Sequence, residues 1–114
     1  MKKLCLALFT GLTVVVLTAT LDLTGKWEVE ANFDDSSLSG GGFDCALKQN
    51  GERLMGTCSD GSAQLTGELK GQNVSWTMKA VTYTGTVNET ATSMKGRFTT
   101  AADKRGSFTA FKSK

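Results

Sequence analysis

Apolar and polar residues alternate along most of the chain after residue 25. The alternation from Lys26 to Phe33 places four apolar residues on one face: Trp27, Val29, Ala31 and Phe33. This pattern is typical of a β-strand with one buried face and one face in water. It recurs in seven later stretches, around residues 43–48, 54–58, 63–70, 74–78, 81–87, 94–98 and 106–110. The chain therefore predicts eight short strands, and only its first twenty residues carry a helical pattern.

Turn residues separate most of these stretches. Asn50-Gly51 and Asp60-Gly61 are hairpin and turn signals, and Gly71-Gln72-Asn73 marks another turn. Lys79-Ala80 contains no such residue. The pattern leaves two alternatives there: a tight turn without glycine or asparagine, or one long bent strand.

Cys45 and Cys58 lie on the two strands that flank Asn50-Gly51. If they face each other, the same register brings the apolar residues of both strands to one face. The further pairs in this register are Leu47 with Gly56 and Gln49 with Leu54. We therefore predict a structural disulfide between them. A metal pair and a redox pair are the alternatives, but the chain lacks histidine for a zinc site and the spacing is not C-x-x-C.

A short repeat of an apolar residue, one spacer and a glycine occurs four times, at residues 54–56, 65–67, 83–85 and 94–96. A glycine on the inward face of a strand marks a sharp bend or the close approach of a neighbour, which a small barrel requires. Eight short antiparallel strands form an up-and-down barrel most economically, because closure leaves no open edge. The predicted fold class is an all-β, eight-stranded antiparallel up-and-down barrel. A two-sheet sandwich is the alternative.

Two lysines precede an apolar stretch from Leu4 to Leu17, a pattern typical of a secretory signal peptide. We expect a signal-peptide helix over residues 1–20, cleaved near its end, and a barrel domain over residues 21–114. The alternative is an uncleaved anchor helix, since Leu4 to Leu21 reaches the lower edge of membrane-spanning length. Cleavage would give a secreted or periplasmic protein with no stable membrane insertion, in a compartment where disulfides persist.

The charge balance excludes a nucleic-acid partner. The chain has 13 basic and 11 acidic residues, and losing the two lysines of the signal would bring the net charge from +2 to zero. A nucleic-acid surface needs a strongly basic patch.

The absence of histidine removes the commonest general base, the usual catalytic triad and most catalytic zinc sites. The alternation places most candidate acids outside the barrel or in turns, so no inward carboxylate pair emerges. These acids are Asp44, Asp60, Glu68 and Asp103. We therefore expect that the protein is not an enzyme and that it binds no cofactor and no metal.

The segment Leu23-Thr24-Gly25-Lys26-Trp27 resembles the G-x-W motif that opens lipocalins, avidins and their relatives in the calycin group. The resemblance implies a lipocalin-like barrel that holds a small, mostly hydrophobic molecule. It also implies a structural pair: Lys112 shares the inward parity of the last strand and would cover Trp27 in a cation–π contact. The family usually carries arginine at that place.

The barrel interior is the expected site of a small hydrophobic ligand, because eight-stranded barrels open at their ends and apolar pockets suit such ligands. Tyr83 would supply one directed hydroxyl. The predicted ligand-binding residues are Phe43, Leu65, Trp76, Met78, Tyr83, Met94 and Phe98. The alternative is that these side chains simply fill a very small barrel as its core.

A second functional hypothesis is a periplasmic protein-binding module such as a protease inhibitor. Small exported inhibitors of bacterial metalloproteases resemble this plan, with a short barrel, a G-x-W start and one disulfide. In that fold an N-terminal tail enters the protease cleft, and here the tail would be Leu21-Asp22-Leu23. The Ser/Gly-rich loop from Asp34 to Gly42 is another candidate contact with a protein partner.

Overall fold

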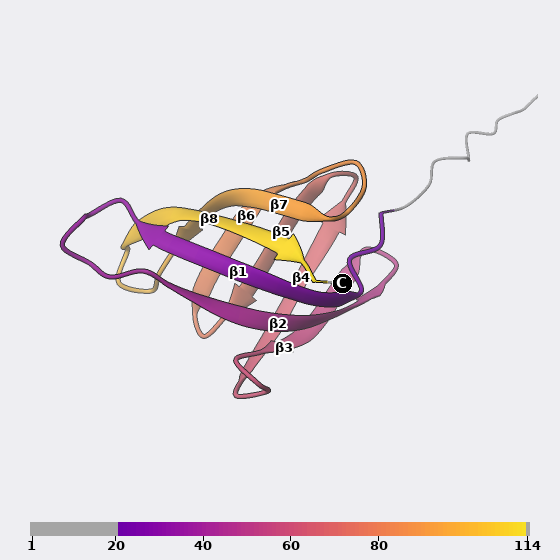
Figure 1. Ribbon diagram of the computed structural model, residues 1–114, viewed down its shortest axis with the longest axis horizontal. Helices are drawn as coiled ribbons and strands as arrows, with labels where there is room; N and C mark the ends of the chain where they lie inside the picture. Colours follow the sequence, from indigo (N-terminus) through magenta and orange to yellow (C-terminus); the bar gives the residue numbers. More distant parts are fainter. Residues whose placement is uncertain (1–20, 114) are drawn as a thin grey trace, which may run out of the picture.

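The computed structural model describes residues 21–113, which form a closed barrel of eight antiparallel strands (Figure 1). Each strand pairs with the next along the chain, and the last pairs with the first. The strands are β1 (Gly25–Phe33), β2 (Gly41–Asn50), β3 (Arg53–Cys58), β4 (Ala63–Lys70), β5 (Asn73–Met78), β6 (Val81–Val87), β7 (Ser93–Thr99) and β8 (Arg105–Lys112). The predicted fold class is confirmed. The expected signal peptide lies outside the described residues.

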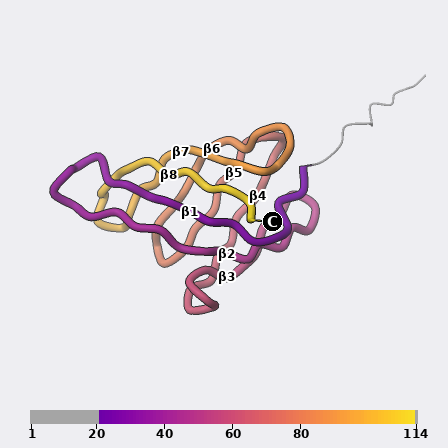
Figure 2. The backbone as a smooth tube through the Cα atoms, viewed as in Figure 1, coloured from indigo at the N-terminus to yellow at the C-terminus, as the bar shows by residue number. Residues whose placement is uncertain are grey.

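Pairing of β1 with β8 closes the barrel. Trp27 lies opposite Lys112, Val29 opposite Ala110 and Ala31 opposite Phe108. The backbone trace shows β1 running between β2 and β8 (Figure 2). Closure satisfies the hydrogen bonds of both strands that would otherwise be edges, so no strand of the sheet is left open to another chain.

Lys79 and Ala80 form a two-residue turn between β5 and β6, with Met78 opposite Val81. Both turn residues adopt the left-handed conformation, with φ of 51° and 63°. Two-residue hairpin loops favour this geometry because its twist matches that of the flanking strands. The tight turn is therefore the correct alternative, although neither residue is one that normally favours positive φ.

The alternation of the strands sorts the side chains as expected. Apart from Gly106, every buried residue between 21 and 113 is hydrophobic, and the charged side chains lie outside the barrel wall. The largest side chains with almost no exposure include Trp27, Phe108, Leu23, Leu54 and Leu65. The core is thus one apolar column along the barrel axis.

The inward glycines of the repeat mark places where neighbouring strands approach closely. Gly85 lies directly opposite Gly96. A Cβ at Gly85 would lie 2.8 Å from the carbonyl carbon of Lys95 and 2.9 Å from the Cα of Gly96. Because these are backbone atoms that cannot rotate away, the tight coil of the barrel depends on the missing side chain.

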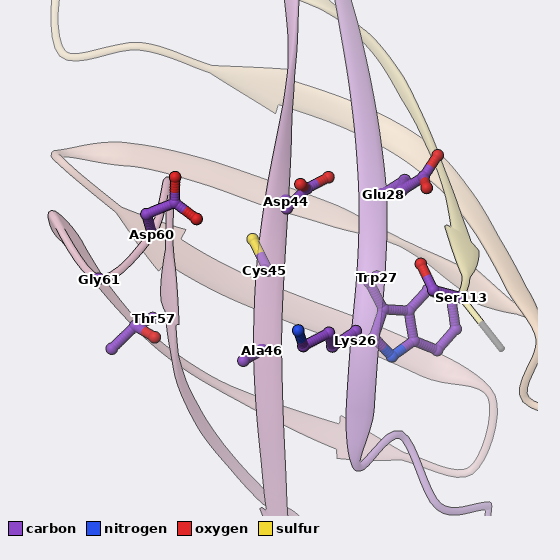
Figure 3. A pocket seen from close by; sticks show the side chains of 10 residues that line it. All are labelled: Lys26, Trp27, Glu28, Asp44, Cys45, Ala46, Thr57, Asp60, Gly61 and Ser113. Carbon is purple, nitrogen blue, oxygen red and sulfur yellow. The ribbon is translucent and has the colours of Figure 1, made fainter.

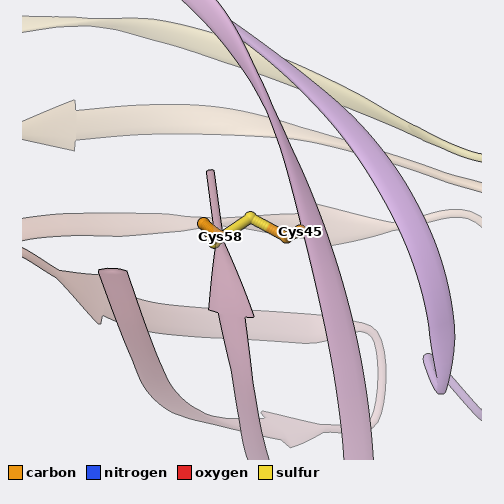
Figure 4. The surroundings of a disulfide bond; sticks show 2 residues. All are labelled: Cys45 and Cys58. Atoms are coloured by element: carbon orange, nitrogen blue, oxygen red, sulfur yellow. A yellow bond between two sulfur atoms is a disulfide. The ribbon is translucent and has the colours of Figure 1, made fainter. Parts of the chain in front are cut away.

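Cys45 and Cys58 form a disulfide across the β2–β3 pair, with an S–S distance of 2.05 Å (Figure 4). They are directly opposed in the register, and Leu47 faces Gly56 as predicted. Both cysteines are buried. The predicted disulfide and its hairpin register are confirmed.

Candidate functional site

One end of the barrel is plugged by the N-terminal residues of the described chain. Leu23 is fully buried, and its carbonyl oxygen accepts a hydrogen bond from the Trp27 indole nitrogen at 2.9 Å. Gln49 holds this segment from the other side: its Oε1 accepts from the Leu23 N–H, and its Nε2 donates to the Leu21 carbonyl, both at 2.8 Å. We call this the plugged end.

The plug bears on the inhibitor hypothesis, because it uses the residues that would form a free tail. Leu21 packs against the core and Leu23 lies inside it. Residues 21–23 are therefore anchored to the barrel by side-chain and backbone contacts. A protein-binding role stays a prediction, and these residues do not project as a tail.

The opposite end carries the β1–β2, β3–β4, β5–β6 and β7–β8 connections, and we call it the loop end. Three hydrophobic side chains near these connections are only partly buried: Phe33, Phe43 and Val81. The β1–β2 and β7–β8 loops lie side by side here, far from the described N-terminal residues (Figure 1). Apolar surface is therefore left incompletely covered at the loop end.

The β1–β2 loop is tied to the barrel. The Asp34 carboxylate accepts hydrogen bonds from both terminal nitrogens of the Arg97 guanidinium: Nη1 donates to Oδ1 at 3.0 Å, and Nη2 donates to Oδ2. The Asp34 N–H donates to the carbonyl of Arg105 at 2.9 Å. The hydrogen bond from Arg97 holds the pKa of Asp34 below its usual value. The pair is exposed, so its effect on stability is small.

Six aromatic rings meet in the loop-end half of the interior. The Trp76 indole stacks on the Tyr83 ring, with centroids 3.9 Å apart and planes 7° from parallel. Phe43 contacts both rings edge-on, at centroid distances of 6.5 and 6.3 Å. Phe108 contacts the same two rings edge-on from β8, at 5.7 and 5.3 Å. The cluster comprises Phe33, Phe43, Trp76, Tyr83, Phe98 and Phe108.

The structure brings most of the predicted ligand-binding residues together. Phe43, Trp76, Tyr83 and Phe98 belong to the aromatic cluster. Leu65 and Met78 are buried and face each other on β4 and β5, next to the cluster. Met94 does not join them: it lies opposite Val87 and Ala110. That position is in the plugged half of the barrel.

Sequence reasoning omitted two members of the cluster, Phe33 and Phe108. The inward parity of both residues was readable from the alternation. Their contacts across the barrel were not, because Phe33 meets Phe98 at 5.2 Å and Phe108 meets Trp76 from strands far apart in sequence. The missing signal was the closed β1–β8 pairing, which decides which inward residues share a level of the barrel.

Trp76 carries a polar atom with no partner. Its Nε1 is buried and makes no hydrogen bond, the one such side-chain atom between residues 21 and 113. Leaving a buried donor unsatisfied costs about 1–3 kcal/mol. The other indole of the chain, Trp27, donates to a backbone carbonyl. The loop-end interior therefore contains one hydrogen-bond donor that the described residues do not satisfy.

Tyr83 contributes the phenol of the cluster. Burial raises the pKa of its hydroxyl, because the phenolate would lose its hydration. The side chain is therefore neutral throughout the physiological pH range and keeps its O–H proton.

Lys112 lies directly opposite Trp27 in the β1–β8 register, as the predicted structural pair requires. Its Nζ is 3.4 Å from the carbonyl oxygen of Asp22, so the ammonium group also ties the plug to the last strand. A Cβ at Gly25 would lie 2.9 Å from the Lys112 Cε, so the lysine side chain passes close over this glycine. The cation–π contact with Trp27 stays a prediction.

A shallow hollow of about 380 Å³ lies on the outer wall over β1, β2 and the end of β3 (Figure 3). Glu28 and Asp44 face each other across neighbouring strands at its side, and Asp60 stands on the turn after β3. Lys26 lies beside them. The candidate acids Asp44 and Asp60 are thus on the exterior, where water screens their charges.

The other two candidate acids also lie outside the barrel. Glu68 is 4.0 Å from the ammonium of Lys70, and Asp103 is 3.6 Å from the guanidinium of Arg105. All four side chains of these pairs are more than half exposed.

Within residues 21–113, no helix is long and apolar enough to cross a membrane.

No protein-family model matches the chain, and no curated protein matches it. Among solved structures, it is similar to a chain described as a de novo design of a fluorescence-activating β-barrel. The two are 16% identical with a TM-score of 0.49, and the match covers 79% of this chain and 93% of the designed one. The molecule is a small β-barrel, and its resemblance to lipocalins stays a prediction.

Proposed function

We propose that this protein binds a small hydrophobic ligand, without catalysis, in the loop-end half of its barrel. The difference between the two ends is the observation that supports this most. The plugged end is sealed by Leu23 and hydrogen-bonded by Gln49. At the loop end, the two half-buried rings of the aromatic cluster, Phe33 and Phe43, lie over its buried rings. A ligand would therefore enter at the loop end.

Entry requires a side chain to move, because the rings pack against one another. Phe43 is suited to this role: it is partly exposed, and it contacts Trp76 and Tyr83 only through edge-on packing. It lies near the start of β2, directly after the β1–β2 loop. Rotation of its ring toward solvent would uncover the stacked Trp76–Tyr83 pair to a ligand.

The proposal includes export. The Cys45–Cys58 disulfide supports an oxidising compartment, where such bonds persist. A secreted or periplasmic location also agrees with the signal-peptide pattern of the first twenty residues.

We also propose that the protein catalyses no reaction on its ligand. General acid–base catalysis needs titratable groups held in a cleft. Here the carboxylates named above lie on the outer wall, and Tyr83 is the one titratable side chain of the aromatic cluster. We expect the ligand to leave unchanged.

A titration with N-phenyl-1-naphthylamine, a neutral dye that fluoresces in apolar surroundings, tests the proposal. We expect saturable binding of one dye per barrel. Phe43→Ala removes the ring that must move, so we expect about tenfold tighter binding, the equivalent of about 1.4 kcal/mol of ring packing.

Leu69→Ala is the matched control, because it removes a buried side chain next to the β4–β5 turn of the plugged half. It should lower stability without changing dye affinity. Absence of saturable dye binding to the wild-type protein and to Phe43→Ala would refute the proposed function.

A further inference from the structure

The loop-end interior contains an unsatisfied hydrogen-bond donor within an otherwise apolar space. Trp76 is 3% exposed and its Nε1 has no partner. The same group of Trp27 donates to the Leu23 carbonyl at 2.9 Å. The fold thus satisfies the indole at the plugged end and leaves the indole at the loop end with a free N–H.

The core cannot supply the missing acceptor from its own side chains. No polar or charged residue among 21–113 is fully buried apart from the two tryptophans and Tyr83. The Tyr83 ring is stacked flat on the Trp76 indole, which keeps its hydroxyl alongside the indole plane rather than in line with it. A buried water needs two to four polar partners, and this space offers few. The acceptor is therefore best supplied by a bound molecule.

The surroundings of Trp76 restrict the chemistry of that molecule. The edge-on ring of Phe108 and the flat face of the Trp76–Tyr83 pair favour a planar aromatic body, since aromatic rings prefer stacked and edge-to-face contacts. No cationic side chain between residues 21 and 113 is buried in the barrel. A carboxylate on the ligand would therefore be an unpaired buried charge, which is strongly unfavourable.

Resting on the proposed function, we infer that the ligand is a neutral, planar aromatic molecule whose carbonyl oxygen or ring nitrogen accepts a hydrogen bond from Trp76 Nε1. Phe43 would move aside to admit it. Aliphatic acids would bind poorly, because they supply neither a flat ring nor a neutral acceptor.

Fluorenone and fluorene test this inference, since both are flat and apolar and differ mainly in one carbonyl oxygen. We expect fluorenone to bind the wild-type protein about tenfold more tightly, the gain from satisfying one buried donor. Trp76→Phe keeps an aromatic ring and removes the N–H, so it should abolish the difference. Trp27→Phe should preserve the difference, because the Trp27 N–H already has its partner.

The indole N–H signals in a ¹⁵N–¹H spectrum of the wild-type protein give a second measurement that needs no variant to bind. Fluorenone should move the Trp76 signal downfield and leave that of Trp27 in place, whereas fluorene should move neither downfield. Either tryptophan variant that folds assigns the two signals.

The outcomes separate the inference from the proposed function. Equal affinities for the two compounds, or a preference that survives Trp76→Phe, would overturn the inference and leave the ligand-binding proposal standing. Failure of fluorene, fluorenone and the naphthylamine dye to bind would overturn both.

Discussion

Reduction of the Cys45–Cys58 disulfide is expected to destabilise the barrel strongly. The bond joins residues 13 apart in sequence. For a loop of that length, the loss of chain entropy in the unfolded state corresponds to about 3 kcal/mol. Small domains are stable by only about 5–15 kcal/mol, so this is a large share. In a domain of this size, 1 kcal/mol shifts the Tm by roughly 4–8 °C. The expected fall is therefore roughly 12–24 °C.

The structure explains why reduction should act through the unfolded state. Both sulfurs lie on a buried face, with Cys45 3% and Cys58 0% exposed. Two thiols can occupy the same apolar space, so packing in the folded barrel changes little. The β2–β3 register would persist, because Leu47 still faces Gly56 in the same sheet.

Thermal unfolding of residues 21–114, followed by circular dichroism with and without a phosphine reductant, measures the effect. The Cys45→Ala/Cys58→Ala double variant serves as the control, because reductant should not change its Tm. It should unfold at or below the temperature of the reduced wild-type protein, since it also loses two buried sulfurs. A fall of less than about 3 °C on reduction would refute the entropic reasoning, as it equals under 1 kcal/mol.

Three further predictions concern a close strand contact, a turn and a surface ion pair. Gly85→Ala should destabilise the protein by about 1–3 kcal/mol in urea unfolding, because its Cβ would meet backbone atoms of the neighbouring strand; Gly41→Ala, with nothing within 4 Å of the added Cβ, should be near neutral. Replacing Lys79 and Ala80 by Asn-Gly should raise stability by about 1 kcal/mol, because both residues have positive φ, and an unchanged urea midpoint would contradict this. The pKa of Asp34 is lowered by its hydrogen bond to a guanidinium, so its stabilising effect is present at neutral pH and lost as pH falls through the folded-state pKa. Asp34→Asn should therefore be slightly less stable than wild type at pH 7 and equally stable once that carboxyl is protonated.

Much of the loop-end site could be predicted because inward parity is a local property of each strand. Trp76, Tyr83 and Phe98 follow directly from the alternation. Met94 satisfies the same parity but lies in the other half of the barrel, opposite Val87. Parity assigns a residue to the interior and says nothing about its height along the axis, which depends on the stagger of neighbouring strands.

The sequence by itself determined the strands, the inward face of each and the β2–β3 register, because two-residue alternation and the Asn50-Gly51 turn act over short distances. Only the tertiary structure decided the closure of β1 on β8, the plug of Leu23 under Trp27 and the meeting of six rings at the loop end. These contacts join residues far apart in the chain, and their geometry follows from the twist and stagger of the whole closed sheet. The unsatisfied indole of Trp76 belongs to this second group, because a hydrogen-bond partner is present or absent only once every neighbour is in place.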